Sequence, residues 1–357
     1  MIVVMAAFLA LFTLLLLVLH FTGAAQGKRI KKMREQLLCL ISGEVEASRI
    51  KNRIYEMVRP DGEIDSISAI PGIRSLRGLQ VISETADELS DEAWDVLSSE
   101  VGGEWFGKYL RKQLDGRNMD SIILVVKLIG ALKLTQYTSE IVAQVYCYRS
   151  VTQMQHIGML SLCLLGAEKE LVAVCRDETI ASLLSFRTLE ELFRTYTGDR
   201  KKLCRILIDT AADLYIRRTC IKAIGEYAYG DLAEMILPYL ECKQFNARVD
   251  AIRTLGQLKY GPALDRIRAF ARDERWEARV VSATALGSYG AENNFDVLLA
   301  LLCDREWWVR YRAAEALVGY PDHAELVRRV EATNDRFAGE MMRFALDKDA
   351  LLRGEVA

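Results

Sequence analysis

A helical pattern recurs at a constant step through the second half of the chain. Each copy has an arginine at the same position, and the four arginines are evenly spaced: Arg217, Arg248, Arg279 and Arg310. A copy of this length is too short for a domain, but it accommodates two helices of about a dozen residues and two turns. Because such a pair cannot bury its apolar face alone, the copies are predicted to stack into a solenoid.

Other positions of the repeat are also predicted to be structural. A small residue follows each arginine after three places, and a large aliphatic residue follows after seven. Glycine follows after eight places in three copies, at Gly225, Gly256 and Gly287, and is expected to end the first helix in a left-handed turn. The second helix is predicted to open at Asp231, Pro262 or Asn293.

Two stretches carry a resemblance to a known family. The sequence VRYRAAEAL at residues 309–317, preceded by Asp304, resembles the short bacterial form of the HEAT repeat. The sequence ARVVSATALG at residues 278–287, preceded by Asp273, is similar to it. We expect both aspartates to cap the helix that follows. The resemblance implies an all-α chain with a right-handed α-α solenoid, in a family whose members mostly bind macromolecules, while a few modify DNA bases or attach pigments.

The amino-terminal residues 2–21 are uncharged and almost entirely apolar. Twenty residues of helix span about 30 Å, the thickness of a bilayer's hydrocarbon, so this run is predicted to be a single transmembrane helix. A cleaved signal peptide is the alternative, although no basic residue precedes the run. Because basic residues crowd residues 28–34, we expect the amino terminus outside the cell membrane and the remainder in the cytoplasm.

The predicted domain organisation follows from these features. Residues 1–25 form the membrane anchor, 26–72 a basic juxtamembrane helix and linker, and 73–213 divergent helical repeats. Residues 214–335 form the regular repeats, and 336–357 form a capping helix whose charged face seals the last repeat. The acidic segment 84–104 is either a docking surface for a basic partner or a solvated helix face.

No catalytic, cofactor or metal site is predicted. The chain has no glycine-rich phosphate loop, no nucleophile elbow and no metal-binding helix motif. Its eight cysteines contain no CxxC pair, and most lie in apolar stretches, so they are interpreted as reduced core residues. With 47 basic and 49 acidic residues, the whole chain has no field that would recruit nucleic acid.

Several residues are candidates for binding a partner. The arginine column could follow a polyanion, but its phase favours contacts with carboxylates or carbonyls of an adjacent repeat. Trp276 and Trp307 are predicted to be core residues, whereas Trp308 is expected to be partly exposed and to contact a partner. Second helices usually line the concave face of such solenoids, which would make a locally basic groove there. Its candidate residues are Arg266, Arg268, Arg272, Arg328 and Arg329.

The hypothesis from the sequence is a non-enzymatic, membrane-anchored cytoplasmic scaffold that binds a protein partner. Its layout resembles bacterial accessory proteins of membrane glycosyltransferases and other envelope machines. Two alternatives are a HEAT-like lyase or other modifying enzyme, and a membrane-tethered nucleic-acid binder. Residues 201–357 contain 24 basic and 24 acidic residues, which argues against the nucleic-acid alternative.

Overall fold

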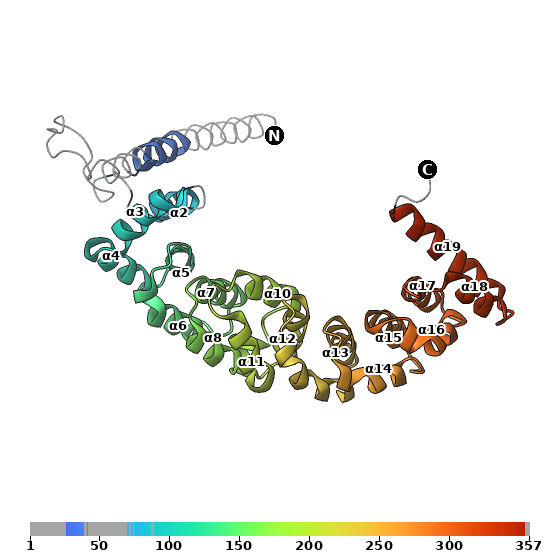
Figure 1. Cartoon of the computed structure of the whole chain (residues 1–357). Coiled ribbons are helices and arrows are strands. Elements are labelled where there is room, and N and C mark those ends of the chain that lie inside the picture. The colour runs from blue at the N-terminus through green and yellow to red at the C-terminus, as the bar shows by residue number, and fades with distance from the viewer. Residues whose placement is uncertain are drawn as a thin grey trace, which may run out of the picture. The chain divides into compact units, whose positions relative to one another are not determined.

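The computed structural model describes residues 26–38, 41, 70, 73, 75–86 and 89–353. These residues form helices and connecting turns, with no strand among them (Figure 1). The predicted transmembrane segment at residues 2–21 lies outside this range, as does most of the predicted linker at residues 59–72. None of the helices in the described ranges combines the length and the apolar character needed to cross a bilayer.

The chain divides into two compact units, of which unit 1 comprises residues 1–173 and 194–198. Its described helices are residues 26–38, α2 (Leu76–Ala86), α3 (Asp91–Gly102), α4 (Glu104–Leu114), α5 (Met119–Ala131), the 3-10 turn η2 (Thr135–Tyr137), α6 (Thr138–Cys147) and α7 (Thr152–Leu164). Two further helices cross the boundary between the units: α8 (Glu168–Cys175) and α10 (Phe186–Thr195).

Unit 2 comprises residues 174–193 and 199–357 and contains the regular repeats. Its helices are α9 (Glu178–Ala181), α11 (Arg200–Thr210), α12 (Leu214–Glu226), η3 (Gly230–Glu241), α13 (Phe245–Gln257), η4 (Gly261–Ala263), α14 (Leu264–Phe270), α15 (Trp276–Tyr289), η5 (Glu292–Asn294), α16 (Phe295–Leu302), α17 (Trp307–Leu317), α18 (His323–Glu331) and α19 (Arg336–Leu352). The first helices of the four repeats are α12, α13, α15 and α17. The second element is the long 3-10 helix η3 after α12, a short 3-10 turn and an α-helix after α13 and α15, and α18 after α17.

The repeat positions that were predicted to pack do so. The small and aliphatic residues of all four first helices are completely buried: Cys220, Ala251, Ser282, Ala313, Ile224, Leu255, Leu286 and Leu317. The recurring sequence positions therefore form the seam between neighbouring repeats.

The repeat glycines do not have the predicted role. Gly256 and Gly287 lie within α13 and α15, and neither has a positive φ. A Cβ atom at Gly256 would lie 2.5 Å from Cβ of Ala285, and one at Gly287 would lie 2.7 Å from Cβ of Ala316. Glycine is therefore required where two first helices touch. The left-handed conformation occurs three residues later in each copy, at Ala228, Lys259 and Gly290.

The close approach of neighbouring first helices agrees with their place on the inner face of unit 2. Figure 1 shows α13, α15 and α17 on the inner side of the curve of unit 2, with α14 and α16 on the outer side. The expectation that second helices line the concave face is therefore wrong for these repeats. The first helices have glycine and alanine at their contacts, which permits the shorter spacing that an inner row needs.

The predicted divergent repeats of unit 1 keep the same packing. A Cβ atom at Gly130 of α5 would lie 2.7 Å from Cα of Ser161 in α7. The hydroxyl of Ser161 donates to the carbonyl oxygen of Val126 at 2.8 Å. In unit 2, Thr254 donates in the same way to the carbonyl oxygen of Ile221 at 3.0 Å. The helices α5 and α7 are therefore first helices of the same kind as those in unit 2.

Two other predictions concern unit 1. Residues 26–38 are helical, and Met33 and Leu37 on their predicted apolar face are buried. In α3, Asp91, Glu92 and Asp95 are exposed or half-buried at the helix surface, so the described part of the acidic segment faces solvent. Whether it binds a partner stays a prediction.

Candidate functional site

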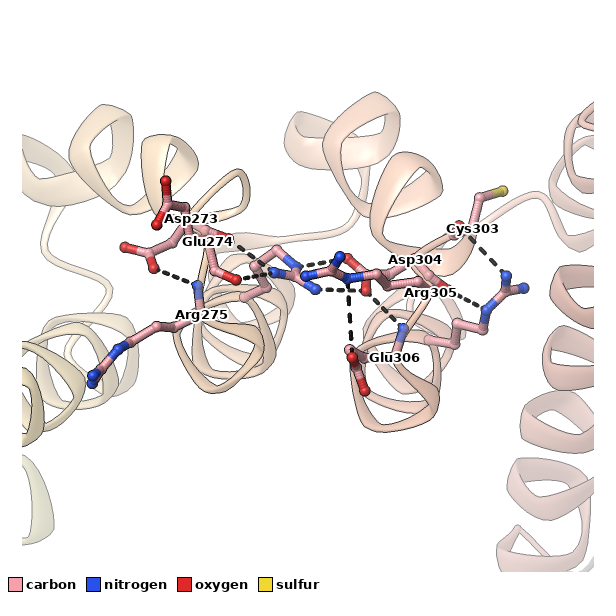
Figure 2. Close-up of polar contacts among 9 residues, drawn as sticks. Asp273, Glu274, Arg275, Cys303, Asp304, Arg305 and Glu306 are labelled. Carbon is pink, nitrogen blue, oxygen red and sulfur yellow. Dashed lines mark hydrogen bonds and ion pairs between the residues drawn. The ribbon is translucent and has the colours of Figure 1, made fainter.

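Arg279 of α15 joins two consecutive repeats. Its Nε and Nη2 atoms donate to the two carboxylate oxygens of Asp304 at 2.7 and 2.8 Å. Its Nη1 atom donates to the carbonyl oxygens of Asp273 and Glu274 at 2.9 and 3.1 Å (Figure 2). The side chains of Arg279 and Asp304 are only 8% and 11% exposed. Four of the five N–H donors of this guanidinium are thus used within the repeat junction.

The other column arginines differ in their partners. Arg310 pairs with Asp335 at 2.9 Å and also donates to the carbonyl oxygen of Asp304. Arg217 donates twice to the carbonyl oxygen of Ala211, at 2.9 and 2.8 Å. In Arg248 the Nε atom is buried without a hydrogen-bond partner. Arg217, Arg279 and Arg310 are thus directed at loops and carboxylates of the stack, and Arg310 also lines a cleft beside α19.

Asp273 and Asp304 do not cap the first helices that follow them, α15 and α17. Asp273 accepts a hydrogen bond from the N–H of Arg275, and Asp304 accepts one from the N–H of Glu306, both at 2.9 Å (Figure 2). Arg275 and Glu306 are themselves the N-cap residues, and neither makes a side-chain cap. The aspartates therefore close the turn that leads into each helix.

The Asp304 carboxylate is held in its charged form. Burial raises the pKa of Asp304, but hydrogen bonds from Arg279 and from the N–H of Glu306 outweigh it, so the pKa lies below its usual value. The hydrogen bond to Asp304 raises the pKa of Arg279 in turn. Both partners are therefore ionised at neutral pH.

Aromatic residues occupy the first turns of the first helices. Trp276 is 38% exposed and Trp307 is 52% exposed, so the prediction that they form inter-repeat core is wrong. Trp276 and Trp307 begin α15 and α17, and much of each indole ring is in solvent at these N-terminal helix ends. Trp308 is 53% exposed, as its repeat phase predicted. With Tyr215 and the half-buried Phe245, these three tryptophans make up a set of aromatic residues in the first turns of the first helices, which we call the aromatic edge.

Trp307, Trp308 and Phe245 of the aromatic edge are ordered by neighbouring rings and by an arginine. Trp307 stacks on Tyr311 with ring centroids 5.2 Å apart, and Trp308 meets Trp307 edge-on at 4.7 Å. Further along, the guanidinium of Arg275 lies 4.2 Å from the ring centroid of Phe245. Stacked rings and cation–π contacts hold these side chains in one arrangement, which lowers the entropy lost on binding.

Tyr311 connects the aromatic edge to the last helix. Lys348 of α19 donates to the Tyr311 hydroxyl at 2.6 Å and to Glu315 at 2.7 Å. Burial favours the neutral form of Glu315, but hydrogen bonds from Lys348, Tyr311 and Arg312 lower its pKa below the usual value. The Phe344 ring lies 6.4 Å from that of Tyr311.

A cleft of 550 Å³ lies between α17 and α19. Its lining residues are Arg305, Trp307, Arg310, Phe337, Glu340, Met341 and Phe344. It is open to solvent along α19, where Phe337 and Phe344 are more than half exposed. The capping helix, which was predicted to seal the last repeat with a charged face, therefore also exposes aromatic side chains.

The five basic residues predicted on second helices do not form a basic groove. Four of them pair with carboxylates: Arg266 with Glu241, Arg268 with Asp265, Arg328 with Glu325, and Arg329 with Asp296. Arg268 and Arg272 line a 450 Å³ cleft, but so do Asp265, Asp296 and Asp304. Neighbouring carboxylates therefore balance most of the positive charge of these arginines.

Sequence reasoning missed three polar residues that make buried or nearly buried contacts: Arg218, Asp250 and Gln155. Arg218 pairs with Asp250 of the next first helix at 2.7 Å, and both side chains are nearly buried. Gln155 in α7 is fully buried and donates to the carbonyl oxygens of Val145 and Tyr148 at 2.8 and 3.0 Å. The sequence did contain a signal for the Arg218–Asp250 pair. Its arginine and aspartate lie about one repeat apart, next to the arginine column.

The described cysteines and histidines do not gather into a metal site. Within the described ranges, no group of three or more His, Cys, Asp and Glu side chains could hold an ion. Cys175, Cys204 and Cys220 are buried in unit 2. Burial raises the pKa of Cys175 to about 12, and burial together with the neighbouring Cys204 raises that of Cys220. The thiols of Cys175 and Cys220 are therefore protonated core groups.

Part of unit 2 matches a known family. Residues 264–337, from α14 to the start of α19, match the family of HEAT repeats. The described part of the chain is all-helical, which is consistent with a HEAT-like solenoid. Among solved structures, the chain is similar to one in the complex of CpcE and CpcF of phycocyanin lyase from Nostoc sp. PCC7120. The two are 12% identical, and the match covers 83% of this chain and 98% of the other, with a TM-score of 0.26. No curated protein matches the chain.

Proposed function

We propose that this chain is a non-catalytic HEAT-repeat scaffold that binds a protein partner through the aromatic edge. Residues 2–21 anchor it in a membrane, with the solenoid on the cytoplasmic side. The observation that carries the proposal is the set of exposed rings at Tyr215, Trp276, Trp307 and Trp308, of which Trp307 and Trp308 contact each other and Tyr311. Tryptophan, tyrosine and arginine dominate the binding energy of protein interfaces, and such rings lose little conformational entropy when they are covered.

The polar side chains of the repeats support a scaffold rather than an enzyme. Arg279, Arg310 and Asp304, which stand out in the sequence, are engaged with carboxylates, with main-chain carbonyls or with each other. A partner at a membrane transferase or another envelope complex fits the predicted anchor. That assignment rests on the sequence layout alone.

Affinity capture from detergent-solubilised membranes tests the proposal. The full chain should retain a stoichiometric protein, and the double substitution Trp307→Ala/Trp308→Ala should reduce its retention at least tenfold. Leu351→Ala, which also removes an exposed apolar side chain, is the matched control and should retain the partner. Deletion of residues 1–25 should move the protein out of the membrane fraction. The proposal fails if no stoichiometric partner is retained and the deletion leaves fractionation unchanged.

A further inference from the structure

A cleft of 710 Å³ lies in unit 1, between the helix of residues 26–38 and the first turn of α2. The guanidinium of Arg77 in α2 joins the two segments, because its Nη2 atom donates to Oε1 of Gln26 at 2.6 Å. Figure 1 shows the same two helices beside each other. The volume of the cleft is in the range of sites that hold small molecules and lipid headgroups.

The charged side chains of this cleft are all basic. Among the described residues that line it, Arg29, Lys32 and Arg77 carry a charge and none is acidic. All three are exposed to solvent. Glu35, the acidic residue of the same helix, pairs with Lys31 at 3.9 Å outside the cleft. The lining therefore offers three positive charges to an anion, with no described carboxylate among them to compete for it.

Apolar side chains line the same cleft. They are Ile30, Met33 and Leu76, and Leu76 is 41% exposed although it lies next to the basic Arg77. Arginine and lysine bind phosphate oxygens by charge-assisted hydrogen bonds. A free phosphate ion has no group that would cover Leu76, whereas a phospholipid has hydrocarbon chains close to its phosphate. Charge and apolar surface together thus fit a lipid better than a free anion.

We propose that this cleft binds the headgroup of an anionic phospholipid, with the phosphate between Arg29, Lys32 and Arg77 and the start of an acyl chain against Leu76. The inference rests on the membrane anchor of the proposed function and names the class of lipid that the anchored chain selects. Arg29 follows residue 21, the last residue of the apolar run, by eight residues. Eight residues of helix rise about 12 Å, so the long side chain of Arg29 can reach back to the headgroup layer.

Arg77 distinguishes this site from the ordinary basic flank of a transmembrane segment. Basic residues that directly follow an anchor attract anionic lipids without forming a defined site. Arg77 does not belong to that flank, because 51 positions separate it from Gln26, and only the folding of unit 1 brings it to the cleft. Selective binding at the cleft therefore depends on Arg77, whereas a diffuse attraction depends on the flank alone.

Native mass spectrometry of the detergent-solubilised full chain tests the site, with phosphatidylglycerol and phosphatidylcholine added in equal amounts. The wild type should retain one phosphatidylglycerol in clear preference to phosphatidylcholine. One basic side chain near an anionic lipid contributes about fivefold, so Arg77→Gln should lower the preference by about that factor. Arg117→Gln, which removes an exposed arginine elsewhere in unit 1, is the matched control and should keep the preference. Equal preference in these two variants, or no preference in the wild type, would overturn the site.

Two double variants of the helix at residues 26–38 separate the cleft from the flank. Arg29→Gln/Lys32→Gln removes two charges that line the cleft, and Lys28→Gln/Lys31→Gln removes two equally exposed charges that do not. The first should lose most of the preference for phosphatidylglycerol and the second should keep it, so equal losses would show a diffuse attraction and refute the cleft. Displacement of the lipid by millimolar inorganic phosphate would show a free-anion site instead.

The lipid measurement is independent of the partner. All of these variants leave the aromatic edge intact, so each should capture the proposed partner as the wild type does. Loss of lipid preference with normal capture is the expected result for Arg77→Gln. If no partner is captured by any form while the lipid preference responds to Arg77→Gln, the scaffold proposal fails and the lipid site stands.

Discussion

Replacement of Arg279 by alanine should destabilise unit 2 far more than the same replacement one repeat earlier. Arg279 makes two hydrogen bonds to the Asp304 carboxylate and two to main-chain carbonyl oxygens, and it is almost fully buried. Arg279→Ala leaves Asp304 charged in a site with little water. Removing one partner of a buried ion pair costs about 3–5 kcal/mol.

Arg248 is the matched control, because it occupies the same repeat position in α13. No carboxylate pairs with it in the described chain, although Asp273 follows it at the same spacing at which Asp304 follows Arg279. Its Nε atom is buried without an acceptor, so its truncation also relieves a desolvation cost. We expect Arg248→Ala to change stability by no more than about 1 kcal/mol.

Thermal unfolding followed by circular dichroism should report the difference. For a unit of this size each kcal/mol corresponds to about 2–4 °C, so Arg279→Ala should lower Tm by at least about 6 °C. Because repeats of a solenoid can unfold separately, hydrogen exchange in α15 and α17 should show the loss locally. In a double-mutant cycle, Arg279→Ala and Asp304→Ala should couple by about 1.5 kcal/mol or more. Equal effects of Arg279→Ala and Arg248→Ala would refute the argument.

Three further outcomes follow from the packing and the ionisable groups. Gly256→Ala should destabilise by about 1–3 kcal/mol in urea unfolding, because the new methyl group overlaps α15, whereas Gly261→Ala, which meets nothing within 4 Å, should be nearly neutral. The folded-state pKa of Asp304 is depressed, so its contribution is present above an unfolded pKa of about 3.9 and is lost as pH falls through the folded value. The Tm difference between the wild type and Asp304→Asn should therefore be largest near neutral pH and shrink below about pH 4, and a constant difference would contradict this. In peptide mapping after thiol alkylation, the exposed Cys147 should react in the native protein and Cys175, whose pKa is raised to about 12, only after unfolding.

The repeat unit could be predicted from the sequence because it depends on spacing. A constant step from one copy to the next fixes which side chains share a helix face, and the buried set at Ala251, Leu255 and Leu286 follows from that alone. The divergent helices α5 and α7 were also predictable from their apolar periodicity. The roles of Gly256 and Asp304 were not, since each residue type suits both a helix end and a repeat junction, and spacing does not distinguish these places.

What tertiary structure decided was the environment of each repeated position. The sequence by itself determined a stack of helix pairs and the seam that holds it, because periodic burial is a local property of the helix. It could not determine that the first helices form the inner row, that Trp307 is exposed, or that α19 exposes aromatic side chains. Those properties depend on how closely one helix approaches the next and on which faces remain uncovered at the last described repeat, and both are set by contacts between residues far apart in the chain.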